Sequence, residues 1–325
     1  HTRCGVVTGV LTCALPISTA LGRDRKSQLT LQLMVAPALI VVILFSYFPM
    51  YGVIIAFKNY DIFKGIMESP WARNNGLEHF IDFFSAPQAG SVIWNTIYMA
   101  FLKLIFCMFP PMVLAVLLNE VRSIKFMKTV QTMSYLPHFI SWAVAGGIFY
   151  NLLNPSRGAL NTLLVDWGIL EKGIDFISDE RYFRPIIVLT QIWKGIGWGS
   201  IIYLGVIVSI DQELYEAVEI DGGKRMAKIR YVTWPFLKPT FAILFIMECG
   251  KIMSGGDTFD QIYVFGNTQN RGVADILDTF INRVGLEQGR YSYATAANLF
   301  KSVINIILLL LANKISGRLT EQSLF

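Results

Sequence analysis

The chain has 325 residues, of which 54% are hydrophobic and only 16% are charged, and its formal net charge is +5. Soluble domains carry about a quarter charged residues, so this composition excludes an ordinary soluble enzyme. Apolar runs of membrane-spanning length indicate instead an all-α integral membrane protein with several spans. The basic residues cluster at the ends of these runs, which argues against a nucleic-acid-binding protein.

The first 18 residues, HTRCGVVTGVLTCALPIS, are set apart from the fold. They lack an initiator Met and resemble translated sequencing-adaptor read-through. A signal peptide is the competing interpretation, but the segment has one basic residue and a weak apolar centre. We therefore treat residues 1–18 as a non-native segment. We expect the native chain to begin near Thr19 and residues 19–325 to form one transmembrane domain.

Six apolar segments follow along the chain, and a helix needs roughly 20 residues to cross a bilayer. The spans are predicted at about 29–57, 92–118, 133–153, 185–208, 236–253 and 294–315. Proline and glycine within them are compatible with membrane helices, where neighbouring helices satisfy the freed carbonyl groups. The expected fold is thus a bundle of six transmembrane helices.

The charges of the connecting segments predict the orientation. The segments rich in Lys and Arg are the N-terminal segment, 119–131, 209–239 and the tail. In the longer loops 58–90, 154–184 and 254–293, acidic residues match or exceed basic ones. Because cytoplasmic loops carry an excess of Lys and Arg, we expect both termini and the segment 209–239 on the cytoplasmic side.

The segment between the fourth and fifth spans, residues 209–239, reads SIDQELYEAVEIDGGKRMAKIRYVTWPFLKP. Ser209 and Gln212 have the spacing of a capping box, so a helix can begin there. The pair Gly222-Gly223 supplies the residue type that ends a helix. An amphipathic helix is therefore predicted, with an acidic face made of Glu213, Glu216 and Glu219.

A second short amphipathic helix is predicted over 224–233, and Pro235 and Pro239 close the interval. The pair of helices could lie on the lipid surface. An acidic face, however, is disfavoured by an anionic inner leaflet. A hinged, acidic, cytoplasmic projection is better suited to docking into a groove of another protein.

The chain shows no pattern typical of catalysis, cofactor binding or metal binding. Nucleotide-binding GxxxxGK, GxSxG and HExxH are all absent, and the four cysteines and three histidines have no metal-ligand spacing. Gly195, Gly197 and Gly199 form GxGxG inside a span, where close helix packing explains them better than a dinucleotide site. We expect no catalytic residue, no metal site and no cofactor on this chain.

A few polar and aromatic residues within the spans are candidates for a translocation path: Trp193, Lys194, Trp198 and Glu248. An unpaired charge there costs on the order of 2.5–3.5 kcal/mol, so such residues often have a function. The tryptophans suit stacking against a sugar ring, and equally an aromatic belt at the membrane surface. Glu248 could instead pair with Lys251 three residues later.

The segment 209–239 resembles the EAA loop of permease subunits from binding-protein-dependent ABC importers. The matching residues are Glu216, Ala217, Val218, Asp221, Gly222, Gly223 and Pro235. Val218 and Gly223 stand where the family pattern has alanine. The flanking sequence, with SYLPHFISW and WKGIGW, resembles the carbohydrate branch, specifically LplB-type permeases for oligo- or polysaccharides, over residues 25–325.

This resemblance implies a bacterial plasma-membrane permease that forms half of a translocation pore. The helix around Glu216–Gly222 would be the coupling helix, within a coupling loop at 209–235, and would dock to a cytoplasmic ABC ATPase. ATP and Mg would bind that partner and not this chain. The further implied partners are a second permease subunit, usually non-identical, and an extracytoplasmic sugar-binding protein.

Two other classes stay open on the residues alone. An ion-coupled secondary transporter would account for the intramembrane charges, but not for the cytoplasmic helices. An integral-membrane enzyme would need acid, base or metal-binding residues near one membrane face, and the sequence offers none at motif spacing.

Overall fold

The computed structural model describes residues 25–251 and 256–320. Across these residues the secondary structure is helical, with no β-strand and one isolated bridge between Lys58 and Trp71. This agrees with the predicted all-α class.

The chain divides into two units, with the boundary after residue 54. The first contains α1 (Arg25–Val42) and the π-helical turn η2 (Ile43–Tyr47), while the 3₁₀ segment η3 (Phe48–Phe57) runs across the boundary. Residues Gln32–Phe57 are long and apolar enough to cross a membrane. They coincide with most of the first predicted span.

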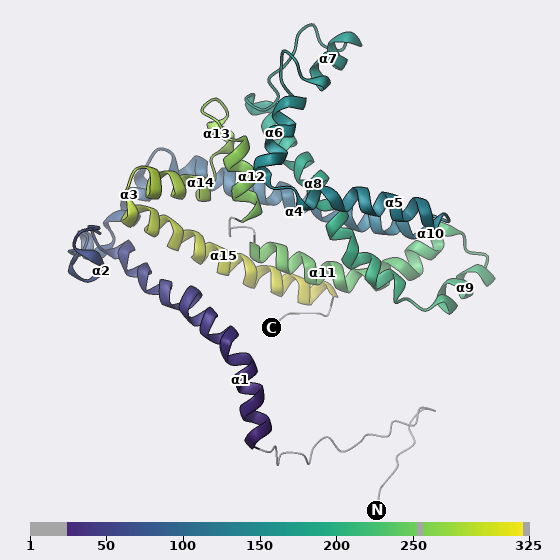
Figure 1. The fold of residues 1–325 in the computed structure, drawn as a ribbon, viewed down its shortest axis with the longest axis horizontal. Helices are drawn as coiled ribbons and strands as arrows, with labels where there is room; N and C mark the ends of the chain where they lie inside the picture. The colour runs from purple at the N-terminus through teal and green to yellow at the C-terminus, as the bar shows by residue number, and fades with distance from the viewer. Residues whose placement is uncertain (1–24, 252–255, 321–325) are drawn as a thin grey trace, which may run out of the picture. The chain divides into compact units, whose positions relative to one another are not determined.

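The second unit is built on long helices. These are α4 (Ala89–Asn119), α8 (Glu180–Val208), α11 (Trp234–Lys251) and α15 (Tyr291–Thr320). α4 packs along α8, and α11 packs along α15 (Figure 1). With the first unit, the described residues contain five helices that could cross a membrane by length and composition.

The third predicted span, 133–153, is not one helix. It is divided into α5 (Ile124–Tyr135), a 3₁₀ turn η5 (Leu136–Phe139) and α6 (Trp142–Leu152). Pro137 fixes its own φ and removes an N–H group, and Ile140 is extended. The Ser141 hydroxyl then accepts a hydrogen bond from the N–H of Val144 and caps a new helix. The apolar pattern of the sequence is continuous here, but the helix is interrupted.

The second predicted helix of the segment 209–239 is not separate from the fifth span. α10 (Arg225–Lys228) continues through a π-helical turn, η6 (Ile229–Thr233), directly into α11. The N–H of Trp234 bonds to the carbonyl of Ile229, and this wider turn accommodates Pro235 in the first turn of α11. The prediction that Pro235 and Pro239 close this interval is wrong, because both prolines lie within α11.

The remaining elements are short. They are α2 (Gly65–Glu68), η4 (Asn74–Gly76), α3 (Glu78–Ser85), α7 (Ala159–Asp166), α9 (Gln212–Ile220), α12 (Asp257–Phe265), α13 (Arg271–Ala274), α14 (Leu277–Asn282) and η7 (Arg283–Glu287). α9 and α10 lie at one end of the long helices, and α3 and α14 lie toward the other (Figure 1).

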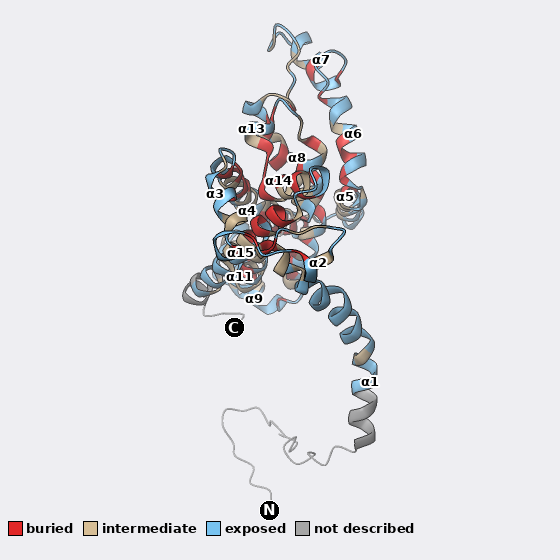
Figure 2. Cartoon of the chain, turned by 90° about the vertical axis from the view of Figure 1, so that its left-hand side faces the viewer, coloured by how far each residue is buried: buried red, intermediate tan, exposed pale blue. Residues whose placement is uncertain are grey.

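Buried residues gather around α4, α8 and α14 (Figure 2). One apolar cluster joins α4, α8 and α11, and includes Ala115, Tyr203 and Leu237. α5 approaches α8 closely at Gly197, where a Cβ atom would come within 2.1 Å of the carbonyl oxygen of Ser134. The glycine-rich stretch of the fourth span therefore serves helix packing, as the sequence indicated.

Candidate functional site

The projection formed by α9 and the turn after it begins with a different cap from the one predicted. The Asp211 carboxylate accepts a hydrogen bond from the N–H of Glu213, so Asp211 is the N-cap of α9. The Ser209 hydroxyl bonds back to the carbonyl of Val206 at the end of α8. The predicted capping box at Ser209 and Gln212 is wrong, because the end of α8 already uses the serine.

The turn after α9 depends on Gly222. This residue has φ +76°, and its N–H donates to the carbonyl of Glu219 at 2.9 Å. The N–H of Gly223 then donates to the carbonyl of Val218 at 2.8 Å, which completes the helix end. Asp221 caps α9 through its backbone N–H, whereas its carboxylate is exposed and has no partner among the described residues. The turn therefore depends on the backbone of Gly222, and the Asp221 side chain does not stabilise it through any contact among the described residues.

Val218 and Gly223 pack against each other. A Cβ atom at Gly223 would lie 2.5 Å from the Val218 Cγ1 atom and 2.7 Å from the Val218 carbonyl oxygen. The family pattern has alanine at both positions, and here a larger residue faces a smaller one. The two departures compensate each other in volume.

This packing predicts that Gly223→Ala loosens the turn, because overpacking costs about 1–3 kcal/mol. Amide hydrogen exchange across 212–228 should accelerate by about tenfold or more. Adding Val218→Ala should recover part of the protection, since it removes the side-chain clash and leaves the clash with the carbonyl oxygen. Gly90→Ala is the control, because nothing lies within 4 Å of its Cβ position. Equal exchange in Gly223→Ala and wild type would contradict this packing.

Three polar contacts hold the projection. The Tyr215 hydroxyl lies 3.1 Å from the Thr233 hydroxyl, and Lys228 forms an ion pair with Glu219. Arg225 pairs at 3.7 Å with Glu120, at the end of α4. The loop after α4 and the segment 209–239, both predicted to be cytoplasmic, thus meet at one end of the bundle.

The outer face of the projection combines acidic and apolar side chains. Glu213, Glu216, Ala217 and Glu219 are exposed. Ile220 is 86% exposed, and Met226, across the turn, is 75% exposed. Apolar side chains with this exposure mark a surface that contacts another protein or the membrane, and an acidic surface is disfavoured by anionic lipid.

A polar cluster lies in the middle of the long helices, around Lys194 of α8. The Lys194 side chain is 8% exposed, and its ammonium lies 3.6 Å from the carboxylate of Asp257 in α12. It also donates to the carbonyl of His138 at 3.3 Å and lies 5.2 Å from the centre of the Trp142 ring. The first residues of α6 and α12, Trp142 and Asp257, therefore converge on one cation.

The carboxylate of Asp257 is well supplied with donors. It accepts hydrogen bonds from the Trp142 indole at 2.5 Å and from the Gln191 amide at 2.9 Å. The ammonium of Lys103, in α4, donates to the Gln191 carbonyl oxygen and to the Thr258 hydroxyl at 3.2 and 3.0 Å. The cluster is a connected network across α4, α6, α8 and α12, and such networks fix side-chain positions.

The other candidate path residues lie in different surroundings. Trp193 packs in the core, edge-on to Phe149 with ring centres 5.2 Å apart. Trp198 is half exposed and stacks on His138 at 4.6 Å. Glu248 is exposed on α11, and its charge interacts with that of Lys103.

The expected pairing of Glu248 with Lys251 lies outside the described residues, because the side chain of Lys251 is not among them. Lys194 therefore belongs to the network and Trp198 lies beside it through its stacking on His138, whereas Trp193 is a packing residue. Sequence reasoning missed Lys103, Asp257 and Trp142 as members. The one available signal was that Asp257 follows a glycine pair, which interrupts a helix, and that acidic residues are enriched in the first turn of the next one.

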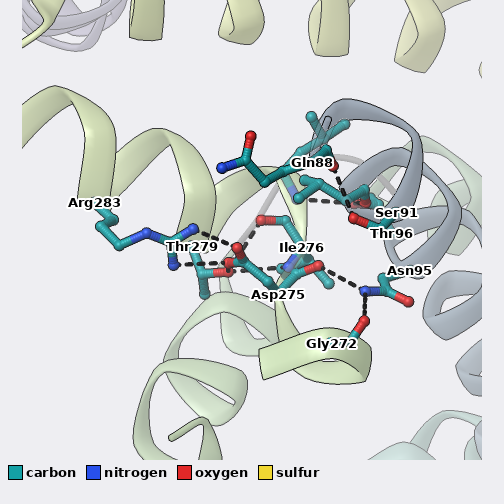
Figure 3. Close-up of polar contacts among 11 residues, drawn as sticks. Gln88, Ser91, Asn95, Thr96, Gly272, Asp275, Ile276, Thr279 and Arg283 are labelled. Carbon is teal, nitrogen blue, oxygen red and sulfur yellow. Dashed lines mark hydrogen bonds and ion pairs between the residues drawn. The ribbon is translucent and has the colours of Figure 1, made fainter. Parts of the chain in front are cut away.

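A polar junction at the other end of the bundle joins α4 to α13 and to the residues after it (Figure 3). Asn95 of α4 is 3% exposed, and its amide donates to the carbonyls of Gly272 and Asp275 at 2.8 and 3.2 Å. Its side-chain oxygen accepts from Arg184, at the start of α8, at 2.8 Å. The Asp275 carboxylate in turn forms an ion pair with Arg283. Asn95 follows the first predicted extracytoplasmic loop, Arg184 ends the second and Asp275 lies within the third, so these three loops meet at one end.

Comparison with known proteins identifies the class. Residues 85–321 match the family described as "Binding-protein-dependent transport system inner membrane component". The chain belongs to this family, which confirms the resemblance seen in the segment 209–239. It is a transport component of the membrane and not an enzyme.

Individual relatives extend over nearly the whole chain. "Protein LplB" of Bacillus subtilis (strain 168) is 40% identical over 97% of this chain and 96% of its own length. The "Polygalacturonan/rhamnogalacturonan transport system permease protein YteP" of the same organism is 39% identical over 91% of this chain and 90% of its own length.

A solved structure is similar in fold. It is a bacterial ABC transporter "involved in the import of the acidic polysaccharide alginate", and it matches with a TM-score of 0.83 and 36% identity. The match covers 93% of this chain and 99% of the other. A second crystal structure, of a bacterial alginate ABC transporter in complex with an "alginate pentasaccharide-bound periplasmic protein", matches equally well.

Proposed function

We propose that this chain is the permease subunit of an ATP-driven importer of oligo- or polysaccharides. It forms half of the translocation pore and docks to a separate ATPase through α9 and the turn at Asp221–Gly222. The end of the bundle that carries α9 faces the cytoplasm, as do both termini. The excess of Lys and Arg in the segments at that end supports this orientation.

The observation that carries the docking proposal is the outer face of the projection. Ile220 and Met226 expose apolar surface to water beside the carboxylate of Asp221, which has no partner in the part of the chain that the structure describes. Internal hydrogen bonds and two ion pairs hold this face in place, so little ordering is needed on binding. ATP and Mg would be bound by the docked subunit.

The carbohydrate class is supported by the relatives. YteP is described as a polygalacturonan/rhamnogalacturonan permease, and the solved transporters are described as importing alginate. All are long sugar chains, so an oligosaccharide is the proposed cargo. A second permease subunit would complete the pore, and an extracytoplasmic binding protein would deliver the sugar, as the periplasmic protein bound to alginate pentasaccharide suggests.

The polar cluster is the proposed translocation path. Lys194 and Gln191 offer hydrogen-bond donors and acceptors in the middle of the bundle, and the ring of Trp198 offers a face for a sugar. Glu248, exposed on the neighbouring α11, would line the same path. The hydroxyl groups of a sugar can form and break hydrogen bonds with these side chains one at a time, so the sugar can bind to the path and also leave it.

Co-purification tests the docking proposal. The chain, co-expressed with its ATPase, should retain that subunit after gentle solubilisation. Asp221→Arg should lose it, because the charge on the outer face is reversed. Asp166→Arg reverses an exposed acid on α7 and should keep it. Retention in Asp221→Arg would move the docking surface elsewhere, and uptake driven by an ion gradient without any ATPase would favour a secondary transporter.

A further inference from the structure

A cavity of about 230 Å³ opens between α12, α13 and η7. It lies beside the polar junction of Figure 3, because Asp275 and Arg283 form part of its wall. Tyr263, Arg271 and Glu287 line it and are exposed. Pockets for drug-sized ligands measure about 300–1,000 Å³, so this cavity suits a smaller group such as one ring.

The charges of this cavity are mixed. Asp275 and Arg283 pair with each other, whereas Arg271 and Glu287 form no ion pair among the described residues. An anion alone would be repelled by Glu287, and a cation alone by Arg271. Hydroxyl groups both donate and accept hydrogen bonds, so a polyol can satisfy the guanidinium and the carboxylate together.

An aromatic face completes the wall. Tyr263 is 56% exposed, and its ring is stacked against Phe259 with centres 5.4 Å apart. A pyranose ring has an apolar face of C–H groups and a rim of hydroxyls. The C–H face can pack on the Tyr263 ring, and the hydroxyl groups can form hydrogen bonds with the charged groups opposite.

The cavity is also held in shape before any ligand binds. Asn267 and Asn270 hydrogen-bond to each other's backbone N–H groups, at 2.8 and 3.0 Å. The Asn267 amide donates to the Ser178 hydroxyl at 3.1 Å, and this ties the turn to the segment before α8. A preformed site loses less entropy on binding.

We propose that this cavity binds one sugar ring of the oligosaccharide at the extracytoplasmic entrance. The proposal rests on the importer function above. Tyr263 lies six residues after Asp257 on α12, which is about 9 Å along the helix axis. A chain of several rings is longer than this axial separation, so its length allows one ring in the cavity and its leading end at the network around Lys194.

Equilibrium binding tests the proposal. The assembled transporter, purified without its binding protein, is titrated with labelled pentasaccharides of alginate and of galacturonate. Tyr263→Ala and Arg271→Gln should each weaken binding about tenfold, as expected for loss of a contact or a charged hydrogen bond. Tyr263→Phe should bind like wild type. The controls Phe63→Ala and Arg157→Gln, exposed residues of other loops on the same side, should change binding less than twofold.

Docking of the binding protein to each variant is measured in parallel. Unaltered pentasaccharide binding in both Tyr263→Ala and Arg271→Gln would overturn the sugar site while the importer function stands. Normal sugar binding with lost docking would make the cavity a protein contact. If the wild-type transporter neither binds nor imports any of a panel of acidic and neutral pentasaccharides, the proposed function itself fails.

Discussion

Replacing Gly222 by proline should abolish transport while leaving the protein in the membrane. Gly222 has φ +76°, and its N–H is hydrogen-bonded to Glu219. Proline fixes φ near −65° and has no N–H, so it is incompatible with the turn on both counts. The cost of roughly 3 kcal/mol or more falls on an exposed projection and not on the apolar core. Uptake and binding-protein-stimulated ATP hydrolysis are the measurements, with membrane insertion followed in parallel.

Asparagine at the same position tests whether the turn needs glycine itself or only its backbone conformation. It adopts positive φ more readily than other non-glycine residues and keeps the N–H group. Nothing lies within 4 Å of the Cβ position of Gly222, so the larger side chain fits. Gly222→Asn should therefore retain most of the transport. Coupled hydrolysis at the wild-type rate in Gly222→Pro would show that this turn does not carry the coupling.

Replacing Lys194 by alanine should reduce uptake at least about tenfold per assembled transporter, because the proposed path loses a charged hydrogen-bonding group. The fold should survive, since Asp257 keeps the Trp142 and Gln191 donors. ATPase docking should be unchanged, as Lys194 lies far along α8 from the coupling loop. Radiolabelled oligosaccharide uptake into vesicles, normalised to the amount of complex, gives the result.

Lys301→Met provides the matched control. Lys301 is also buried and paired with a carboxylate, Asp278, but lies in a different cluster on α15. Removing one partner of such a pair costs stability. This variant should lower the amount of complex without changing uptake per complex. Wild-type uptake in Lys194→Ala would remove Lys194 from the path.

Structural features that depend on neighbouring residues in the chain could be predicted from the sequence. Long apolar runs located the continuous helices, and the glycine pair located the end of α9, because both depend on residues near one another in the chain. The loop 209–239 could be interpreted in this way before any contact was known. Asp211 displaced Ser209 as the cap because the serine hydroxyl was already bonded to α8.

The polar network could not be predicted from the sequence pattern. Its members come from α4, α6, α8 and α12, and the bond between Trp142 and Asp257 joins residues 115 positions apart. Periodicity records which face of one helix is apolar, and it carries no information on which polar residues of two helices meet. The break at Ser141 was hidden for a related reason, since the residues on both sides of it are apolar.

The helix α8 has a mechanical consequence. It runs without interruption from Glu180 to Val208, so it is about 43 Å long. This one helix contains Arg184 of the polar junction and Lys194 of the network. Asp211, the N-cap of α9, follows shortly after its end. A tilt of about 5° would move one end by about 4 Å relative to the other. Movement at the proposed docking end would thus reach the proposed sugar path as a rigid rotation, without any helix having to unfold.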